Sequence, residues 1–420
     1  MEIVRPSWDS HDLSGSEKTN VKRYFFIFSL MFLSFFSFNL VGKFLLVELF
    51  FVCIFLSNVL GRRIATSTRK LNPFIGLLIL ALFSQTIIDM VLGTPPISML
   101  KGFSLILFTL TNLYGISLLT KFRTMDILIA LLGYSLGGLA GYFLQPSTYA
   151  RSEIWKFGIG YPLTLTFFVI LSLPSLKRFR LYTWASLTLL SAVSLVLGAR
   201  SLALFTILPL FFLKYKKSEM KVKNSKTIWS LLIILGVTLT FFTIYSNLAV
   251  NGTLGTKAQS KYLAQTTSGG NLIFNSRSEL IFSARGIIDS PILGHGSYAD
   301  MNPELKMKIL YFLDRLGIQY DLVSLNRIYG DRIPVHSMLL QWWLWFGVIG
   351  MFFPLRLGIL YIKSLRIPNR QPVFYYLALS GIWNVLFSPY GENYRVLIPL
   401  TIVALVSLGK NLPMENTSND

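Results

Sequence analysis

The sequence is short of charged residues and of cysteine. Charged side chains make up 14% of the 420 residues, whereas soluble globular proteins carry roughly 25%. Cys53 is the one cysteine, so a disulfide within the chain is impossible and a cysteine-based metal site is not expected. Residues 1–20 lack the basic start, short apolar core and small-residue cleavage site of a removable signal peptide. We therefore expect the first apolar helix to stay attached.

Hydrophobic residues are abundant instead. They make up 53% of the chain, and the mean hydropathy is +0.57. Apolar runs of about 17 to 25 residues recur, which is the length that crosses a bilayer as a helix. We predict an all-α polytopic membrane protein with about twelve transmembrane helices. The expected spans are 24–40, 44–60, 73–92, 98–120, 124–145, 154–175, 181–199, 201–214, 227–246, 336–362, 373–389 and 395–409.

The basic residues indicate which side of the membrane each loop occupies. The formal net charge is +20, and the basic clusters all fall on one side if the N-terminus is cytoplasmic. The short opposite loops at 93–97 and 390–394 contain no basic residue. This distribution follows the positive-inside rule and places both termini in the cytoplasm. Membrane lipids are therefore expected partners of the clusters, and nucleic acid is not, since no basic nucleic-acid motif occurs.

This topology divides the chain into five parts. They are a cytoplasmic N-terminal tail (1–23), helices one to nine (24–245), an outer-face loop (246–335), helices ten to twelve (336–409) and a cytoplasmic C-terminal tail (410–420). The loop is the one large segment on the outer face. Its apolar spacing predicts two amphipathic helices, at 276–288 and 303–316. No internal repeat and no separate soluble domain is visible.

Three arginines are candidates for binding an anion. Arg200 interrupts an apolar run at the tip of an expected helical hairpin, where a buried arginine needs an anionic partner. Alternatively, Arg200 marks the tip and reaches outward to water. Arg277 and Arg285 lie about two turns apart on the first loop helix, so both could reach one pyrophosphate. Exposed salt bridges, such as Arg285 with Asp289, are the alternative.

His336 is the histidine best placed to move a proton. It begins the tenth expected span, where the helix dipole favours the neutral imidazole that accepts a proton. The alternative is a simple interfacial histidine. His295 lies between Gly294 and Gly296, which favours a structural role in a turn.

Motifs for metals and soluble cofactors are missing. No HxxxH pattern, outer carboxylate cluster, Walker motif or dinucleotide fingerprint occurs, so neither a metal nor a cofactor is expected. A transfer reaction would then draw on a pre-activated substrate. At the outer face of a membrane, that predicts a lipid-linked donor.

Three blocks of the chain resemble motifs of a known family. Leu197–Ser201, which contains Arg200, is similar to a small-Ser-Arg hairpin. Arg277 followed by Ile287–Gly296 resembles an arginine followed by aliphatic-x-x-Pro-x-x-Gly-x-Gly. Val335–Gly350 resembles His-Asn-x-x-Leu followed by a Gly-aliphatic-aliphatic-Gly helix.

Together, over roughly Ser191 to Gly350, these blocks resemble the O-antigen ligase and O-antigen polymerase superfamily of bacterial polysaccharide assembly. The chain departs from the family at two positions. Ala199 stands where a serine is common, and Ser337 stands where asparagine is usual.

The resemblance implies a GT-C-like glycosyltransferase of the bacterial inner membrane, with its long loop in the periplasm. The donor would be an undecaprenyl-diphosphate-linked glycan. Arg200 and Arg277, with Arg285 as a further candidate, would bind the diphosphate. His336 would act as general base on the acceptor hydroxyl or orient it, and the anomeric centre would be inverted.

The resemblance leaves the acceptor open. A polymerase would use another lipid-linked glycan, a ligase would use lipid A–core oligosaccharide, and some relatives transfer to protein. A transporter or flippase is the rival class, because twelve spans is a common count for carriers. The absence of an internal repeat argues against it.

Overall fold

The computed structural model describes residues 13–39, 42–61, 66–173, 180–215, 243–253, 278–315, 332–367 and 371–408, with a few residues between 236 and 263. Five helices in this part of the chain are long and apolar enough to cross a membrane, and further apolar helices are shorter. The described chain is mainly helical, as expected of an all-α membrane protein. The count of about twelve spans stays a prediction.

The elements follow the apolar runs of the sequence closely. In order they are α1 (Leu13–Phe32), η1 (Leu33–Phe35), β1 (Ser37–Asn39), β2 (Lys43–Leu45), α2 (Leu46–Leu60), η2 (Thr66–Leu71), α3 (Asn72–Val91), α4 (Pro96–Thr120), α5 (Thr124–Leu144), α6 (Thr148–Ser152), η3 (Ile154–Ile159), α7 (Gly160–Ser172), α8 (Arg180–Val196), α9 (Arg200–Tyr215), α13 (Ser278–Asp289), α14 (Pro303–Arg315), α16 (Met338–Arg366), α17 (Pro372–Phe387) and α18 (Tyr394–Leu408).

The N-terminal region differs most from the expectation. The helix α1 begins at Leu13, inside the expected tail, and ends at Phe32 rather than near residue 40. The chain then forms an antiparallel hairpin in which Phe38 pairs with Phe44, and their rings stack at 5.7 Å. Paired aromatic side chains stabilise such a strand pair. The expected span 227–246 lies largely outside the described residues.

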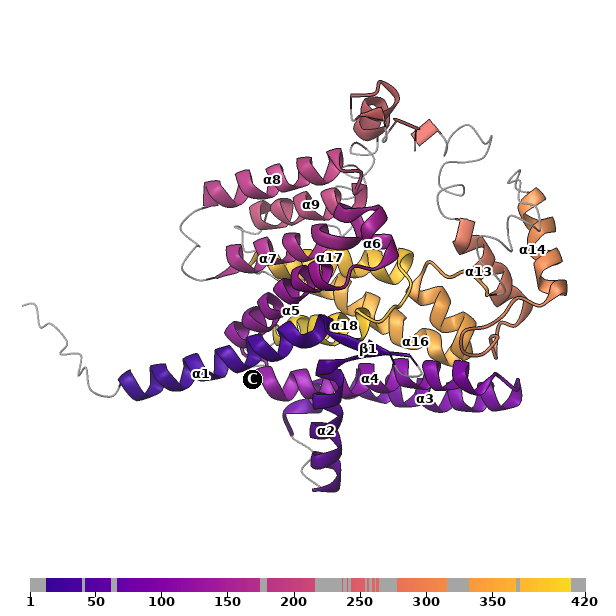
Figure 1. Ribbon diagram of the computed structural model, residues 1–420, viewed down its shortest axis with the longest axis horizontal. Coiled ribbons are helices and arrows are strands. Elements are labelled where there is room, and N and C mark those ends of the chain that lie inside the picture. The colour runs from indigo at the N-terminus through magenta and orange to yellow at the C-terminus, as the bar shows by residue number, and fades with distance from the viewer. Residues whose placement is uncertain are drawn as a thin grey trace, which may run out of the picture.

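The helix α16 lies at the centre of the packing. It packs against α3 and α17, while α4 packs against α18 and α5 against α1. The helices α8 and α9 lie side by side, and α2 points away from the other helices (Figure 1). We call the end at which α3 and α17 finish, and α4, α9, α16 and α18 begin, the loop end of the bundle.

The two expected amphipathic helices are present as α13 and α14. The helix α13 packs against α16, and α14 packs against α13 (Figure 1). Leu305 and Ile309 are buried as expected, but Phe312 is 37% exposed and Leu313 takes its place. Ile288 is also exposed, at 62%. The buried faces are therefore rotated slightly from the expected ones, because contact with neighbouring helices decides which residues are covered.

Candidate functional site at the loop end

The helix α16 is interrupted where a loop inserts against it. Gly347 has φ 67° and ψ −170°, which breaks the helical hydrogen-bond ladder. The N–H of Val348 donates to the carbonyl of Ile292 at 3.0 Å, and the N–H of His295 donates to the carbonyl of Leu344 at 2.7 Å. We call residues 291–298 and 343–348 the helix–loop junction. Its hydrogen bonds satisfy backbone groups that the break leaves without helical partners.

Glycine is required on both sides of the helix–loop junction. A Cβ at Gly347 would overlap the carbonyl oxygen of Ile292, and a Cβ at Gly294 would lie 2.5 Å from the carbonyl oxygen of Leu344. Gly294 also has a positive φ of 73°. The second and third sequence blocks therefore form one structural unit, because each supplies a glycine that lets the other approach.

A buried carboxylate fastens the junction to α3. Asp89 is 1% exposed and accepts hydrogen bonds from the N–H and the hydroxyl of Ser297, at 2.7 and 2.6 Å. The hydroxyl of Thr94 donates to the same carboxylate at 2.9 Å, and the Gln85 amide also donates to it. Sequence reasoning missed Asp89, although an acidic residue in the last turn of an apolar span is itself a signal.

His336 lies just before Ser337, the N-cap residue of α16, and is half-buried. The next residue, Ser337, caps the helix by accepting a hydrogen bond from the N–H of Leu340 at 3.3 Å. The Ser337 hydroxyl also donates to the carbonyl of Val385 near the end of α17, at 3.1 Å. His336 is thus held at a helix N-terminus, next to the last turn of α17.

Arg200 begins α9 and is half-buried. Its guanidinium carbon lies 4.6 Å from the ring centroid of Tyr245, a favourable cation–π contact. Further along α9, the ring of Phe205 lies 5.4 Å from that of Trp383 on α17. Trp383 is within one turn of the residue that binds Ser337, so Arg200 and His336 lie toward the same end of the bundle.

The remaining candidates from the sequence are Arg277, Arg285 and His295. Arg277 lies outside the described residues. Arg285 lies half-buried on α13, which packs against α16. The ion pair of Asp289 in the described chain is with Lys308, at 2.9 Å, rather than with Arg285. The ring of His295 binds the carbonyl of Gly286 through Nε2 at 2.8 Å, which fits the structural role that its flanking glycines predict.

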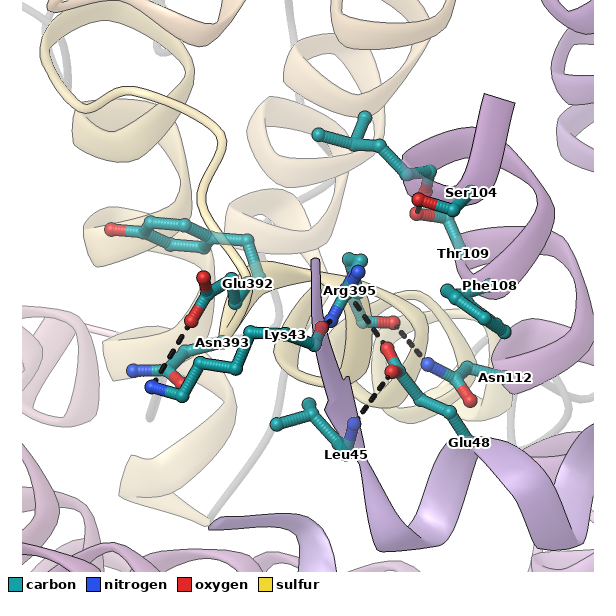
Figure 2. Close-up of polar contacts among 12 residues, drawn as sticks. Lys43, Leu45, Glu48, Ser104, Phe108, Thr109, Asn112, Glu392, Asn393 and Arg395 are labelled. Carbon is teal, nitrogen blue, oxygen red and sulfur yellow. Dashed lines mark hydrogen bonds and ion pairs between the residues drawn. The ribbon is translucent and has the colours of Figure 1, made fainter. Parts of the chain in front are cut away.

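The loop end also holds a cluster of ion pairs that was not expected from the sequence (Figure 2). Arg395, in the first turn of α18, is 6% exposed, and its Nε lies 2.9 Å from Oε1 of Glu48. The other Glu48 oxygen accepts from the N–H of Leu45 at 2.9 Å. Arg395 also donates to the carbonyl of Lys43 at 2.6 Å, and the ammonium of Lys43 lies 3.1 Å from Glu392.

Comparison with protein-family models, with curated protein sequences and with solved structures finds no match. Within the described part of the chain, no group of three or more His, Cys, Asp or Glu side chains is gathered as metal ligands.

The loop end thus gathers cations, aromatic rings and a histidine on helix ends that neighbouring elements hold in place. Guanidinium groups bind phosphate oxygens through a planar fork of donors. A half-buried imidazole can take a proton from a hydroxyl that binds beside it. The arrangement suits the transfer of a group from a phosphorylated donor to a hydroxyl acceptor.

Proposed function

We propose that this chain is a membrane glycosyltransferase that moves an undecaprenyl-diphosphate-linked oligo- or polysaccharide to an acceptor hydroxyl. In this proposal it is an O-antigen or exopolysaccharide polymerase or an O-antigen ligase, and transfer to protein is the third acceptor class. The reaction takes place at the outer face of the bacterial inner membrane. The twelve-span, GT-C-like architecture and the cytoplasmic location of both termini belong to the same proposal.

The observation that carries the proposal is that a half-buried arginine and a half-buried histidine share one end of the helices. Arg200 begins α9 and His336 precedes α16, and the end of α17 contacts both α9 and the residue after His336. Residues about 136 positions apart in sequence are thereby brought toward one another across a single helix. Transfer of a glycan from a diphosphate to a hydroxyl needs both kinds of group near each other.

The proposed reaction divides the work between these groups. Arg200 and Arg277, with Arg285, bind the diphosphate and stabilise the charge that develops as its bond to the anomeric carbon breaks. His336 accepts the proton of the acceptor hydroxyl, whose oxygen forms the new bond to that carbon. Attack from the side opposite the leaving diphosphate inverts the anomeric centre. The reaction needs no metal, since arginines can supply the positive charge.

The break in α16 is a structural feature that favours a transporter, because carriers bind substrates and ions at interrupted helices. In such carriers the freed backbone groups face the ligand. Here the carbonyls of Leu344 and Ile292 accept hydrogen bonds from the chain's own N–H groups, at 2.7 and 3.0 Å. The loop therefore occupies the place that a transported ligand would need, which supports the transferase proposal over the transporter.

A deletion strain tests the proposal. Analysis of lipid-linked and lipid A-linked glycans should show single repeats accumulating on the carrier if the chain is a polymerase. Complete polymer on the carrier, with none on lipid A, would indicate a ligase. Loss of substrate uptake with normal glycans would contradict the transferase proposal and support a transporter.

Arg277 gives a sharper test of the diphosphate-binding role. We expect Arg277→Ala to abolish glycan transfer while the protein still inserts in the membrane. Arg277→Lys should fail as well, because an ammonium group cannot reproduce bidentate contact with phosphate oxygens. A glycan gel with near-normal ladders from Arg277→Ala, at equal protein levels in the membrane, would refute this role.

A further inference from the structure

Two cationic side chains converge on one aromatic ring at the loop end. The Nζ of Lys101, in the first turns of α4, lies 5.9 Å from the ring centroid of Tyr298. The guanidinium carbon of Arg332, in the segment before α16, lies 5.4 Å from the same centroid. Each contact is favourable by itself, but two like charges beside one ring repel each other unless an anion lies near them.

The neighbouring cations already have carboxylate partners, whereas these two do not. Arg395 is paired with Glu48 and Lys43 with Glu392 (Figure 2). Among the described residues, neither Lys101 nor Arg332 forms an ion pair with a carboxylate. Within the described residues, the two cations on Tyr298 therefore have no carboxylate in direct contact, and nearby Asp89 is bound by uncharged donors.

Asp300 lies beside Arg332 through its backbone. It forms a single antiparallel bridge with Arg332, yet its side chain is exposed and forms no ion pair within the described residues. A carboxylate built to neutralise Arg332 would be expected to contact it from this position. The bridge instead fixes the backbone, so that Arg332 projects beside the ring.

The backbone of Tyr298 is held in a conformation that costs free energy. Tyr298 has a φ of 55°, a left-handed conformation that costs a bulky residue on the order of 1–3 kcal/mol. The preceding residue, Ser297, is bound by its N–H and its hydroxyl to buried Asp89, at 2.7 and 2.6 Å. The following residue accepts a hydrogen bond from the N–H of Ile333 at 3.1 Å. Strain fixed from both sides is characteristic of ligand sites.

The surroundings of the ring are electrostatically coupled to the paired cluster. Burial raises the pKa of the Tyr298 phenol above its usual value, Arg395 and Arg332 lower it, and Glu392 raises it. The ring of Trp345 lies 4.5 Å from that of Tyr298. Lys101 also lies next to the hairpin that carries Lys43, since a Cβ at Gly42 would be 3.8 Å from its Cγ. These groups form one partly covered, cationic surface at the loop end.

We propose that Lys101 and Arg332 form a second phosphate-binding subsite, distinct from the one at Arg200, which holds the diphosphate of a second prenyl-linked molecule. Lysine supplies a compact point charge and arginine a planar fork, a combination that suits a phosphate approached from two sides. This assignment rests on the proposed function and extends it. A transferase with two prenyl-diphosphate subsites joins two lipid-linked glycans, so the acceptor is lipid-linked and the chain is a polymerase.

Binding stoichiometry tests the subsite. The probe is farnesyl diphosphate, titrated by calorimetry into the full-length protein in phosphatidylcholine nanodiscs. The wild type should bind two molecules and the double variant Lys101→Ala/Arg332→Ala one. Arg200→Ala should also bind one. Lys308→Ala, which removes an exposed cation paired with Glu304 at 2.6 Å, is the matched control and should bind two.

The outcomes separate the subsite from the proposed function. A wild type that binds one molecule, lost in Lys101→Ala/Arg332→Ala and kept in Arg200→Ala, would support the subsite while the donor site failed. Unchanged stoichiometry in Lys101→Ala/Arg332→Ala would overturn the subsite, provided that the variant melts at the wild-type temperature. Arg332→Lys keeps the positive charge. It should therefore bind about tenfold more tightly than Arg332→Ala, and less tightly than the wild type.

A second set of nanodiscs identifies the source of the phosphate. Part of the phosphatidylcholine is replaced by phosphatidylglycerol, whose headgroup carries one phosphate. If the subsite is built for a prenyl diphosphate, the stoichiometry stays at two. If phosphatidylglycerol displaces one farnesyl diphosphate, and this displacement is lost in Lys101→Ala/Arg332→Ala, the site binds membrane headgroups and the acceptor assignment is overturned.

Discussion

The helix–loop junction and the α8–α9 hairpin each depend on a glycine with positive φ, and they depend on it for different reasons. Gly347 has a φ of 67° and its missing Cβ leaves room for the carbonyl of Ile292. Gly198 has a φ of 78°, but a Cβ there would meet nothing within 4 Å. The hairpin needs only the backbone conformation, whereas the junction needs both the conformation and the space. We conclude that the junction is the less tolerant of the two regions.

The same contrast appears in their hydrogen bonds. At the junction, buried Asp89 accepts four hydrogen bonds, from Gln85, from Thr94 and from two groups of Ser297. The hairpin is closed mainly by local backbone hydrogen bonds, such as that from the N–H of Ala199 to the carbonyl of Ser194 at 2.8 Å. The junction joins segments far apart in sequence, and the hairpin joins neighbours.

The largest effect is expected from Gly347→Ala. The added methyl group would overlap the carbonyl of Ile292 and force an unfavourable φ, which together cost about 3 to 5 kcal/mol. A marked fall in the thermal melting temperature of the purified protein in detergent would show this. Gly358→Ala is the matched control on the same helix, because its Cβ would meet nothing within 4 Å. If both variants have the same melting temperature, the junction tolerates a side chain at residue 347 and its close contacts are not required.

Asp89→Asn should have the next largest effect. The amide would turn an N–H₂ group toward the hydrogen-bond donors that surround residue 89, and the negative charge that these donors bind would be lost. The free energy of unfolding should fall by about 2 to 3 kcal/mol. The melting temperature should fall, and limited proteolysis should cleave the loop around Ser297 sooner. Glu304→Gln, which alters an exposed pair with Lys308, is the control and should change neither. Equal proteolysis rates in the two variants would contradict the role assigned to Asp89.

Gly198→Ala should have the smallest effect on stability. Only the positive φ is penalised, so the cost is about 1 kcal/mol. A small shift in melting temperature is expected, against none or a slight rise for Gly76→Ala, whose Cβ would also meet nothing within 4 Å. A loss as large as that of Gly347→Ala would remove the distinction between the two regions.

Much of the fold could be predicted because apolar runs specify helices directly. The expected spans 98–120 and 124–145 correspond to α4 and α5, and the ends of each helix lie within about two residues of the expected ends. The strand pair β1–β2 was missed because β1 continues the apolar run of α1 and β2 leads directly into that of α2. Apolar composition marks what is buried in lipid or protein, and it does not distinguish a strand pair from the end of a helix.

The candidate site could be predicted only in part. Arg200 and His336 could be named as candidates because an arginine inside an apolar run and a histidine at a helix start are conspicuous in sequence. The Lys101–Arg332 pair was not, since each looks like a single boundary charge until the chain brings them to Tyr298. Their meeting depends on long-range packing, which no local pattern records.

In the proposed function, His336 is the base that accepts the proton of the acceptor hydroxyl. Glycans from a strain whose copy carries His336→Ala test it most directly, with the amount of protein in the membrane measured in parallel. We predict that transfer is lost while the protein is inserted at the normal level. A normal glycan ladder from His336→Ala, at equal protein level, would contradict the claim.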